Sequence, residues 1–144
     1  MKILSRILAL GATLFALNAS ALDYITTTLN GGTNNVAAST TNSYTTHAVF
    51  TAAYSSDIAL QPIFKLTGSG TSAVVFVFDI SLDGSNWYSS AFTISVTAAG
   101  TSTVTKTASQ SLGSQPYVRL SSIQNPNASA ITNLSLVATM KRGL

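Results

Sequence analysis

After an apolar N-terminal stretch, short apolar runs alternate with clusters of Gly, Asn, Ser and Pro, without the 3.6-residue period of an amphipathic helix. The clearest predicted strand is 73–82, in which alternate residues are apolar: Val74, Phe76, Phe78, Ile80 and Leu82. Because Val75 and Val77 fall on the other face, we expect this strand to be central and covered on both sides for part of its length. Asp79 and Ser81 continue that second face, and we expect them to mark where it reaches solvent.

Further strands surround this one. A strand at 91–97 is expected to form a hairpin with 102–108 through the Gly-containing connection 98–101. The returning segment has few apolar residues, which is typical of an edge strand. Pro62 demotes part of another strand to an edge or a bulge, because proline cannot donate to a sheet ladder. The remaining predicted strands are 24–29, 45–54, 58–67, 117–123 and 131–140.

The number and spacing of these segments indicate the fold class. Val118 and Leu120 are predicted to face inward, and Arg119 is predicted to face the opposite way. Seven or eight short strands at this spacing predict an all-β fold, a single antiparallel β-sandwich with Ig-like or jelly-roll topology. The periodicity does not distinguish these two topologies. We assign residues 45–144 to the sandwich domain.

Residues 1–21 form an apolar leader with the three parts of a secretory signal peptide. Lys2 and Arg6 make a positive start, an apolar run of 11 residues follows, and Ala-Ser-Ala ending at Ala21 supplies the small residues of a cleavage site. The run is shorter than the about 20 apolar residues that a membrane-spanning helix needs. The pattern predicts export and cleavage, against the alternative of a helix retained in the mature protein. Residues 22–44 are predicted to form a polar extended arm or loop with one strand.

The composition is poor in charge. Charged residues make up 8% of the chain, compared with about 25% in average domains, and Glu is absent. A hydrophobic content of 46% argues against disorder, so the surface must consist largely of hydroxyl and amide groups. Such a surface tolerates association with copies of the same chain or with another protein. No basic stripe with interleaved aromatics is present, which argues against nucleic-acid binding, and membrane contact is expected only through the leader.

The sequence contains no recognisable catalytic constellation. His47 is the only histidine and has no acid or nucleophile motif beside it, which favours an ordinary strand histidine over a member of a catalytic pair. The four Asp residues are not placed as a glycosidase pair, and the absence of Cys excludes disulfides and thiolate chemistry. We therefore predict a protein that is not an enzyme and has no cofactor.

The stretch FVFDISLDGSNWYSS, residues 76–90, concentrates polar and aromatic residues. Its oxygen ligands Asp79, Asp83 and Asn86 are spaced four and three residues apart, unlike the alternating ligands and final Glu of a calcium loop, so no metal site is predicted. Asp83 and Gly84 are instead predicted to form a turn between two strands.

Two aromatic residues follow this turn. Trp87 is expected to begin the next strand and to plug one end of the core, which we favour over an exposed platform. If Trp87 and Tyr88 faced solvent, they would suit a sugar or protein contact. Asn86, Trp87 and Tyr88 are therefore the candidate contact or ligand surface.

The hairpin SLDGSNW followed by the strand YVRL resembles small β-sandwich accessory and decoration proteins of tailed-phage virions, over residues 68–140. A weaker similarity is to discoidin-like carbohydrate-binding domains, which share a DG.NW and YVR pairing. The phage resemblance implies a non-enzymatic virion protein, such as a capsid decoration or minor virion protein, that contacts itself and other virion proteins in many copies. The leader departs from that pattern. The alternative is an exported binding or adhesin-like module, secreted or at the cell surface after cleavage at Ala21, that recognises glycans or a cell surface.

Overall fold

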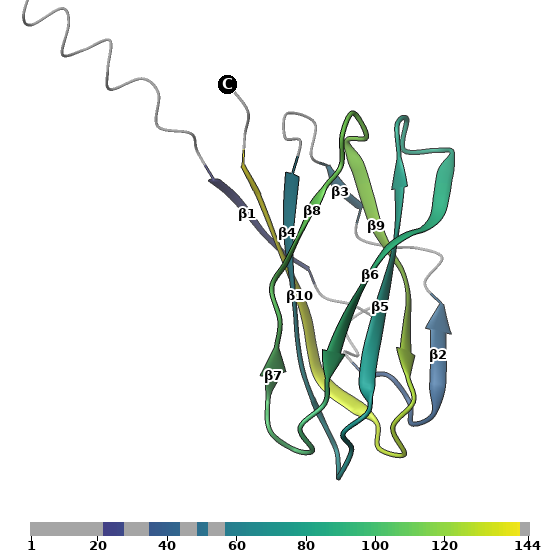
Figure 1. The fold of residues 1–144 in the computed structure, drawn as a ribbon, viewed down its shortest axis with the longest axis vertical. Coiled ribbons are helices and arrows are strands. Elements are labelled where there is room, and N and C mark those ends of the chain that lie inside the picture. Colours follow the sequence, from purple (N-terminus) through teal and green to yellow (C-terminus); the bar gives the residue numbers. More distant parts are fainter. Residues whose placement is uncertain (1–21, 28–34, 44–48, 52–56, 142–144) are drawn as a thin grey trace, which may run out of the picture.

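The computed structural model describes residues 22–27, 35–43, 49–51 and 57–141, and these form two packed antiparallel β-sheets (Figure 1). No helix occurs in these ranges, and so none that could cross a membrane. The strands are β1 (Leu22–Thr27), β2 (Thr40–Ser43), β3 (Val49–Thr51), β4 (Asp57–Leu66), β5 (Ala73–Ser81), β6 (Trp87–Thr97), β7 (Val104–Thr105), β8 (Ala108–Ser111), β9 (Tyr117–Asn125) and β10 (Ile131–Lys141).

The strand order is that of a jelly roll. The first sheet runs β1-β10-β4, with β7 and β8 both paired to β4, and the second runs β9-β5-β6, with β2 and β3 both paired to β9. If β2 and β3 are counted as one interrupted strand, and β7 and β8 as another, the sandwich has eight strands. Successive strands then alternate between the two sheets, except that β5 and β6 form a hairpin within one sheet. In an Ig-like domain several consecutive strands are neighbours in one sheet. The predicted sandwich is confirmed, and its order matches the jelly-roll alternative.

The core lies between the two sheets and contains the alternating residues of the predicted strands. Val74, Phe76 and Phe78 of β5 are fully buried, and Val118 and Leu120 of the neighbouring β9 point into the same core, as predicted. Aromatic contacts join the layers and the strands within them, with ring centroids 5.9 Å apart for Phe64 and Phe76 and 4.9 Å apart for Phe78 and Phe92.

The hairpin predicted between 91–97 and 102–108 is wrong. Among the described strands β6 pairs with β5 alone, and the returning segment pairs with β4 in the other sheet. The connection is held to the β4–β5 loop by backbone hydrogen bonds: Gly100 N–H donates to Gly70 O (3.0 Å), and Leu66 N–H donates to Gly100 O (3.1 Å). These bonds direct the chain across the sandwich. The returning segment is nevertheless an edge, as predicted.

Pro62 does not make β4 an edge strand, because β10 lies on one side of β4 and β7 and β8 lie on the other. The partner on the second side is interrupted instead. The β8 ladder covers residues 57–60 of β4 and the β7 ladder covers 63–64, so the gap falls at Pro62, which has no N–H to donate.

The described parts of residues 22–44 belong to the sandwich. The β1 strand, close to the predicted 24–29, pairs with β10 along its whole length, and Val36 is fully buried and bridged to Ile131. The leader at residues 1–21, His47 and most of the predicted strand at 45–54 lie outside the described residues.

Candidate functional site

The turn between β5 and β6 is built around the Asp83 carboxylate. Its Oδ1 accepts hydrogen bonds from the backbone N–H groups of Ser85 (2.8 Å) and Asn86 (2.7 Å). Its Oδ2 accepts one from Asn86 Nδ2 (2.7 Å), and Gly84 adopts a left-handed φ of 72°. Asp83 and Gly84 therefore occupy the turn-forming positions for which they were proposed.

The same hydrogen bonds tune the acidity of Asp83. The backbone bond from Asn86, followed by that from Ser85, holds the pKa of the carboxyl far below its usual range, because both donors favour the ionised form. The ionised carboxylate therefore serves to stabilise the turn through its hydrogen bonds. Across the part of the chain that the structure describes, no group of three His, Cys, Asp or Glu side chains is placed to hold a metal ion.

Asp79 lies on the outward face of β5 but is only 2% exposed, which contradicts the expectation that it marks the solvent end of the strand. Its Oδ2 lies 3.0 Å from both Nε and Nη2 of Arg119, which faces it in the β5–β9 ladder. Its Oδ1 accepts a hydrogen bond from the backbone N–H of Ser90 (2.9 Å). The Arg119 side chain covers the carboxylate and supplies the charge that makes its burial tolerable.

Trp87 completes this arrangement. The guanidinium carbon of Arg119 lies 4.2 Å from the centroid of the Trp87 ring, a cation–π contact. Trp87 pairs with Ser81 on the outward side of the second sheet and is half-buried, so it is not the core plug that we favoured. It is not a free platform either, because Arg119 packs over its ring. We refer to Asp79, Trp87, Ser90 and Arg119 as the outer clamp.

The outer clamp also fixes a bulge in β6. The β5–β6 ladder shifts register between Phe78 and Ile80, and Ser90 adopts a positive φ of 54° there. The hydrogen bond from Ser90 to Asp79 holds this unusual backbone. Tyr88 is therefore held between two fixed points, the bulge on one side and the Asp83 turn on the other.

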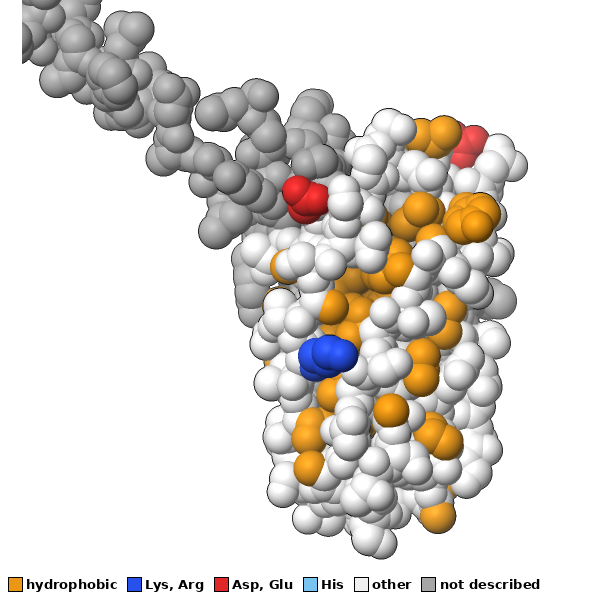
Figure 2. Space-filling model, viewed as in Figure 1, with side chains coloured by type: hydrophobic (Ala, Val, Ile, Leu, Met, Phe, Trp, Pro, Cys, Tyr) orange, Lys and Arg blue, Asp and Glu red, His pale blue; other side chains and the backbone are white. Residues whose placement is uncertain are grey.

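Tyr88 and Leu82 are the exposed large hydrophobic side chains of the described structure, 68% and 62% exposed. Figure 2 shows hydrophobic side chains gathered beside an acidic one at the end of the β5–β6 hairpin where its turn lies. A hollow of about 200 Å³, here the Tyr88 hollow, is lined by Ile80, Ser81, Leu82, Asp83, Asn86, Tyr88 and Gln115. Two of the three residues of the candidate surface, Asn86 and Tyr88, meet there, while Trp87 faces the other side of the sheet.

Gln115 is the residue of this hollow that sequence reasoning missed. It lies in the loop before β9, where its backbone N–H donates to Leu112 O (3.0 Å). Its side-chain Oε1 is buried and has no hydrogen-bond partner among the described residues. In the sequence it stands in a polar turn cluster, SQSLGSQP, with no motif to single it out.

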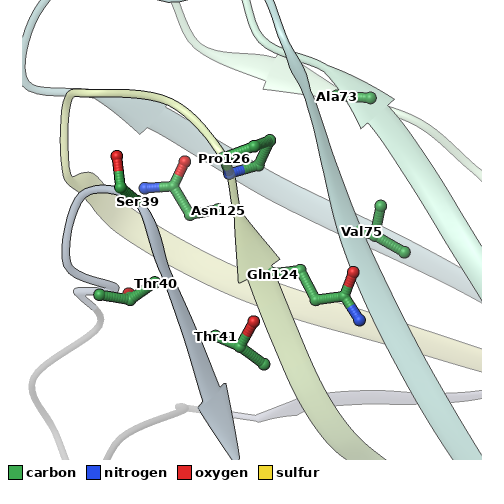
Figure 3. Close-up of a pocket in the computed structure, with 8 residues that line it drawn as sticks. All are labelled: Ser39, Thr40, Thr41, Ala73, Val75, Gln124, Asn125 and Pro126. Carbon is green, nitrogen blue, oxygen red and sulfur yellow. The ribbon is translucent and has the colours of Figure 1, made fainter.

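A second hollow of about 320 Å³ opens on the outward face of the second sheet (Figure 3). Its lining comes from β2, β5, β9 and the adjoining turns, and it contains hydroxyl, amide and small apolar groups without a charge: Ser39, Thr40, Thr41, Ala73, Val75, Gln124, Asn125 and Pro126. Within this lining, the buried Asn125 donates from Nδ2 to Ala37 O (3.0 Å) and Ser129 O (2.9 Å). These bonds fix the turns at its rim.

No family model matches this chain, and no curated protein matches it. Among solved structures it is similar to a chain described by the words "Bacillus endospore appendages form a novel family of disulfide-linked pili". The two chains are 15% identical over 85% of this chain and 88% of the other, with a TM-score of 0.36. That TM-score is too low to support an inference about function. This chain has no cysteine and cannot form disulfide links.

Proposed function

We propose that this chain is a non-enzymatic structural or accessory protein of a phage particle, such as a capsid decoration or minor virion protein. It works by contact with copies of itself and with other virion proteins. The proposal rests on a surface, the outward face of the sheet formed by β2, β3, β9, β5 and β6, which we call the neutral face.

The charges of the neutral face are paired with each other. Asp79 and Arg119 are the only charged residues at the described outward positions of these strands, and they form the ion pair of the outer clamp. A face without an unpaired charge can be covered by another protein without leaving a charge desolvated and alone, which is the costly event in association. This pairing is the single observation that carries the proposal.

The rest of the neutral face offers uncharged hydrogen-bonding groups and small apolar ones. Thr41, Thr93 and Gln124 are exposed, Val75 is half-buried, and the hollow of Figure 3 lies among them. Protein interfaces combine apolar contact with about one hydrogen bond per 100–200 Å². The neutral face is suited to that kind of contact.

The assignment to a phage particle is supported by the resemblance in SLDGSNW and YVRL. Trp87 ends the first of these stretches, and Arg119 lies in the second. The two stretches that carry the resemblance therefore also supply the two partners of the cation–π contact on the neutral face.

The test of this assignment is the protein content of purified virus particles, measured by mass spectrometry. We expect peptides of this chain in particles at many copies relative to the portal or tail proteins. Their absence from particles, together with recovery from the particle-free medium of a chain that begins at Leu22, would overturn the virion assignment and favour the exported module.

A further inference from the structure

One residue that lines the Tyr88 hollow, Gln115, has a buried acceptor that lacks a donor. Gln115 Oε1 is buried without a hydrogen-bond partner among the described residues, and buried polar atoms of this kind are rare in folded proteins. Gln115 belongs to the lining of a hollow with strongly exposed side chains at its rim. A ligand that enters the hollow could therefore supply the missing donor.

The other residues that line the hollow indicate which kind of ligand would supply this hydrogen-bond donor. Tyr88 presents an aromatic side chain that is 68% exposed, and Leu82 and Ile80 add apolar surface. Asp83 Oδ2, which accepts one hydrogen bond from Asn86, adds a second acceptor at the exposed turn. A ligand with an apolar face and several hydroxyl donors matches an aromatic ring flanked by two acceptors.

Charge narrows the ligand class. The lining contains one charged residue, the Asp83 carboxylate, and no Lys or Arg. This carboxylate repels anions, and among the described residues it is not part of any group of three His, Cys, Asp or Glu side chains that could hold a metal ion. The hollow, at about 200 Å³, is also smaller than the about 300–1,000 Å³ pockets of drug-sized ligands. A ligand that consists of one uncharged ring satisfies both the charge and the volume of the hollow.

We propose that the Tyr88 hollow binds one neutral saccharide ring, with the apolar face of the sugar on Tyr88 and a sugar hydroxyl donating to Gln115 Oε1. The site is preorganised, because the Asp83 turn and the Ser90 bulge hold the backbone on both sides of Tyr88. Preorganisation reduces the ordering cost of binding. Such a small contact area supports weak, millimolar affinity.

This site is independent of the assembly role, because the Tyr88 hollow and the neutral face share only one residue, Ser81, whose side chain is buried. A chain that never assembles would still bind a sugar here. Conversely, an assembled particle with many copies would convert a weak single site into strong multivalent attachment.

The test is a nuclear magnetic resonance titration of the ¹⁵N-labelled full chain with methyl glycosides of glucose, galactose and mannose and with N-acetylglucosamine. We expect saturable shifts of the Tyr88 backbone amide and the Gln115 side-chain amide with at least one of these sugars. Tyr88→Ala and Gln115→Leu should each weaken binding at least tenfold. Gln110→Leu is the matched control, because Gln110 lies in β8 outside the hollow, and it should bind like the wild type.

The proposal is overturned if none of the sugars gives a saturable shift, which would mean that water alone satisfies Gln115. It is also overturned if Gln115→Leu binds as well as Gln110→Leu, or if glucuronate binds more tightly than the glucoside. Repeating the titration on an assembly-defective variant separates the two proposals, since sugar binding should survive there.

Discussion

Asp79 and Arg119 face each other across β5 and β9, and their ion pair positions the guanidinium 4.2 Å from the centroid of the Trp87 ring. This relationship turns a buried carboxylate, a partly exposed cation and an aromatic residue into one neutral unit. The pair leaves the described outward positions of the strands in the second sheet without a free charge.

Removing one partner of this pair should destabilise the fold. Asp79 is 2% exposed and Arg119 is 27% exposed, so Arg119→Gln leaves a buried carboxylate without its counter-charge. We expect a loss of about 3 kcal/mol in the free energy of unfolding, the low end of the range for buried pairs because Arg119 is partly exposed. Urea denaturation of the two single variants, Arg119→Gln and Asp79→Asn, and of the double variant gives the coupling energy. A coupling energy near zero would contradict the clamp.

The same substitution should change the fluorescence of the chain's single tryptophan. In Arg119→Gln the guanidinium no longer covers the Trp87 ring, so water reaches it and its emission maximum should shift to longer wavelength. Lys106→Gln, which removes a cation that donates to Ser95 O at the edge of β6, serves as the control and should leave the emission unchanged. Identical spectra for all three proteins would exclude the cation–π contact in solution.

The Asp83 turn should weaken in acid. The folded state lowers the pKa of Asp83 below its ordinary value of about 3.8, so its contribution is fully present above that pH and is lost as pH falls toward the depressed folded value. Hydrogen exchange of the Ser85 and Asn86 amides should be faster in Asp83→Ala than in the wild type, because both amides donate to the carboxylate. Unchanged protection of these two amides would be inconsistent with the turn.

Gly70 should tolerate no side chain. A Cβ at this position would lie 2.5 Å from Leu66 Cδ1 and 2.7 Å from Asn127 Oδ1, and both neighbours are buried. We expect Gly70→Ala to cost about 1–3 kcal/mol of stability, as overpacking does. The control is Gly68→Ala, whose Cβ would meet the Ser129 hydroxyl, which can rotate away at the cost of an exposed hydrogen bond to Ser69 O (2.9 Å). Equal melting temperatures for the two variants would refute the packing argument.

The sequence predicted well those features that side-chain periodicity records directly. The alternation at 73–82 predicted the inward face of β5, and the pattern around Val118 predicted the inward face of β9. It failed where a feature depends on a distant partner. Asp79 is buried because Arg119, 40 residues later, covers it, and no local pattern carries that information.

The part of the candidate site that depends on adjacent residues was predicted, and the part that depends on a distant loop was not. The Asp83 turn is encoded in a few adjacent residues, so Asp83 and Gly84 could be recognised there. The Tyr88 hollow also needs Gln115 from a loop that only the jelly-roll order brings close to the turn. The strand partner of 91–97 was missed because the crossing depends on backbone bonds of Gly100, which side-chain patterns do not record.

The central claim is that the neutral face is a protein-contact surface, and light scattering of the purified chain tests it most directly. The account predicts that the wild type associates as its concentration rises and that Thr93→Lys, which adds a charge to an exposed outward position of β6, remains monomeric. Thr105→Lys adds the same charge to an exposed outward position of β7 in the other sheet and should associate like the wild type. A wild type that stays monomeric at every concentration, or two lysine variants that behave alike, would contradict the claim.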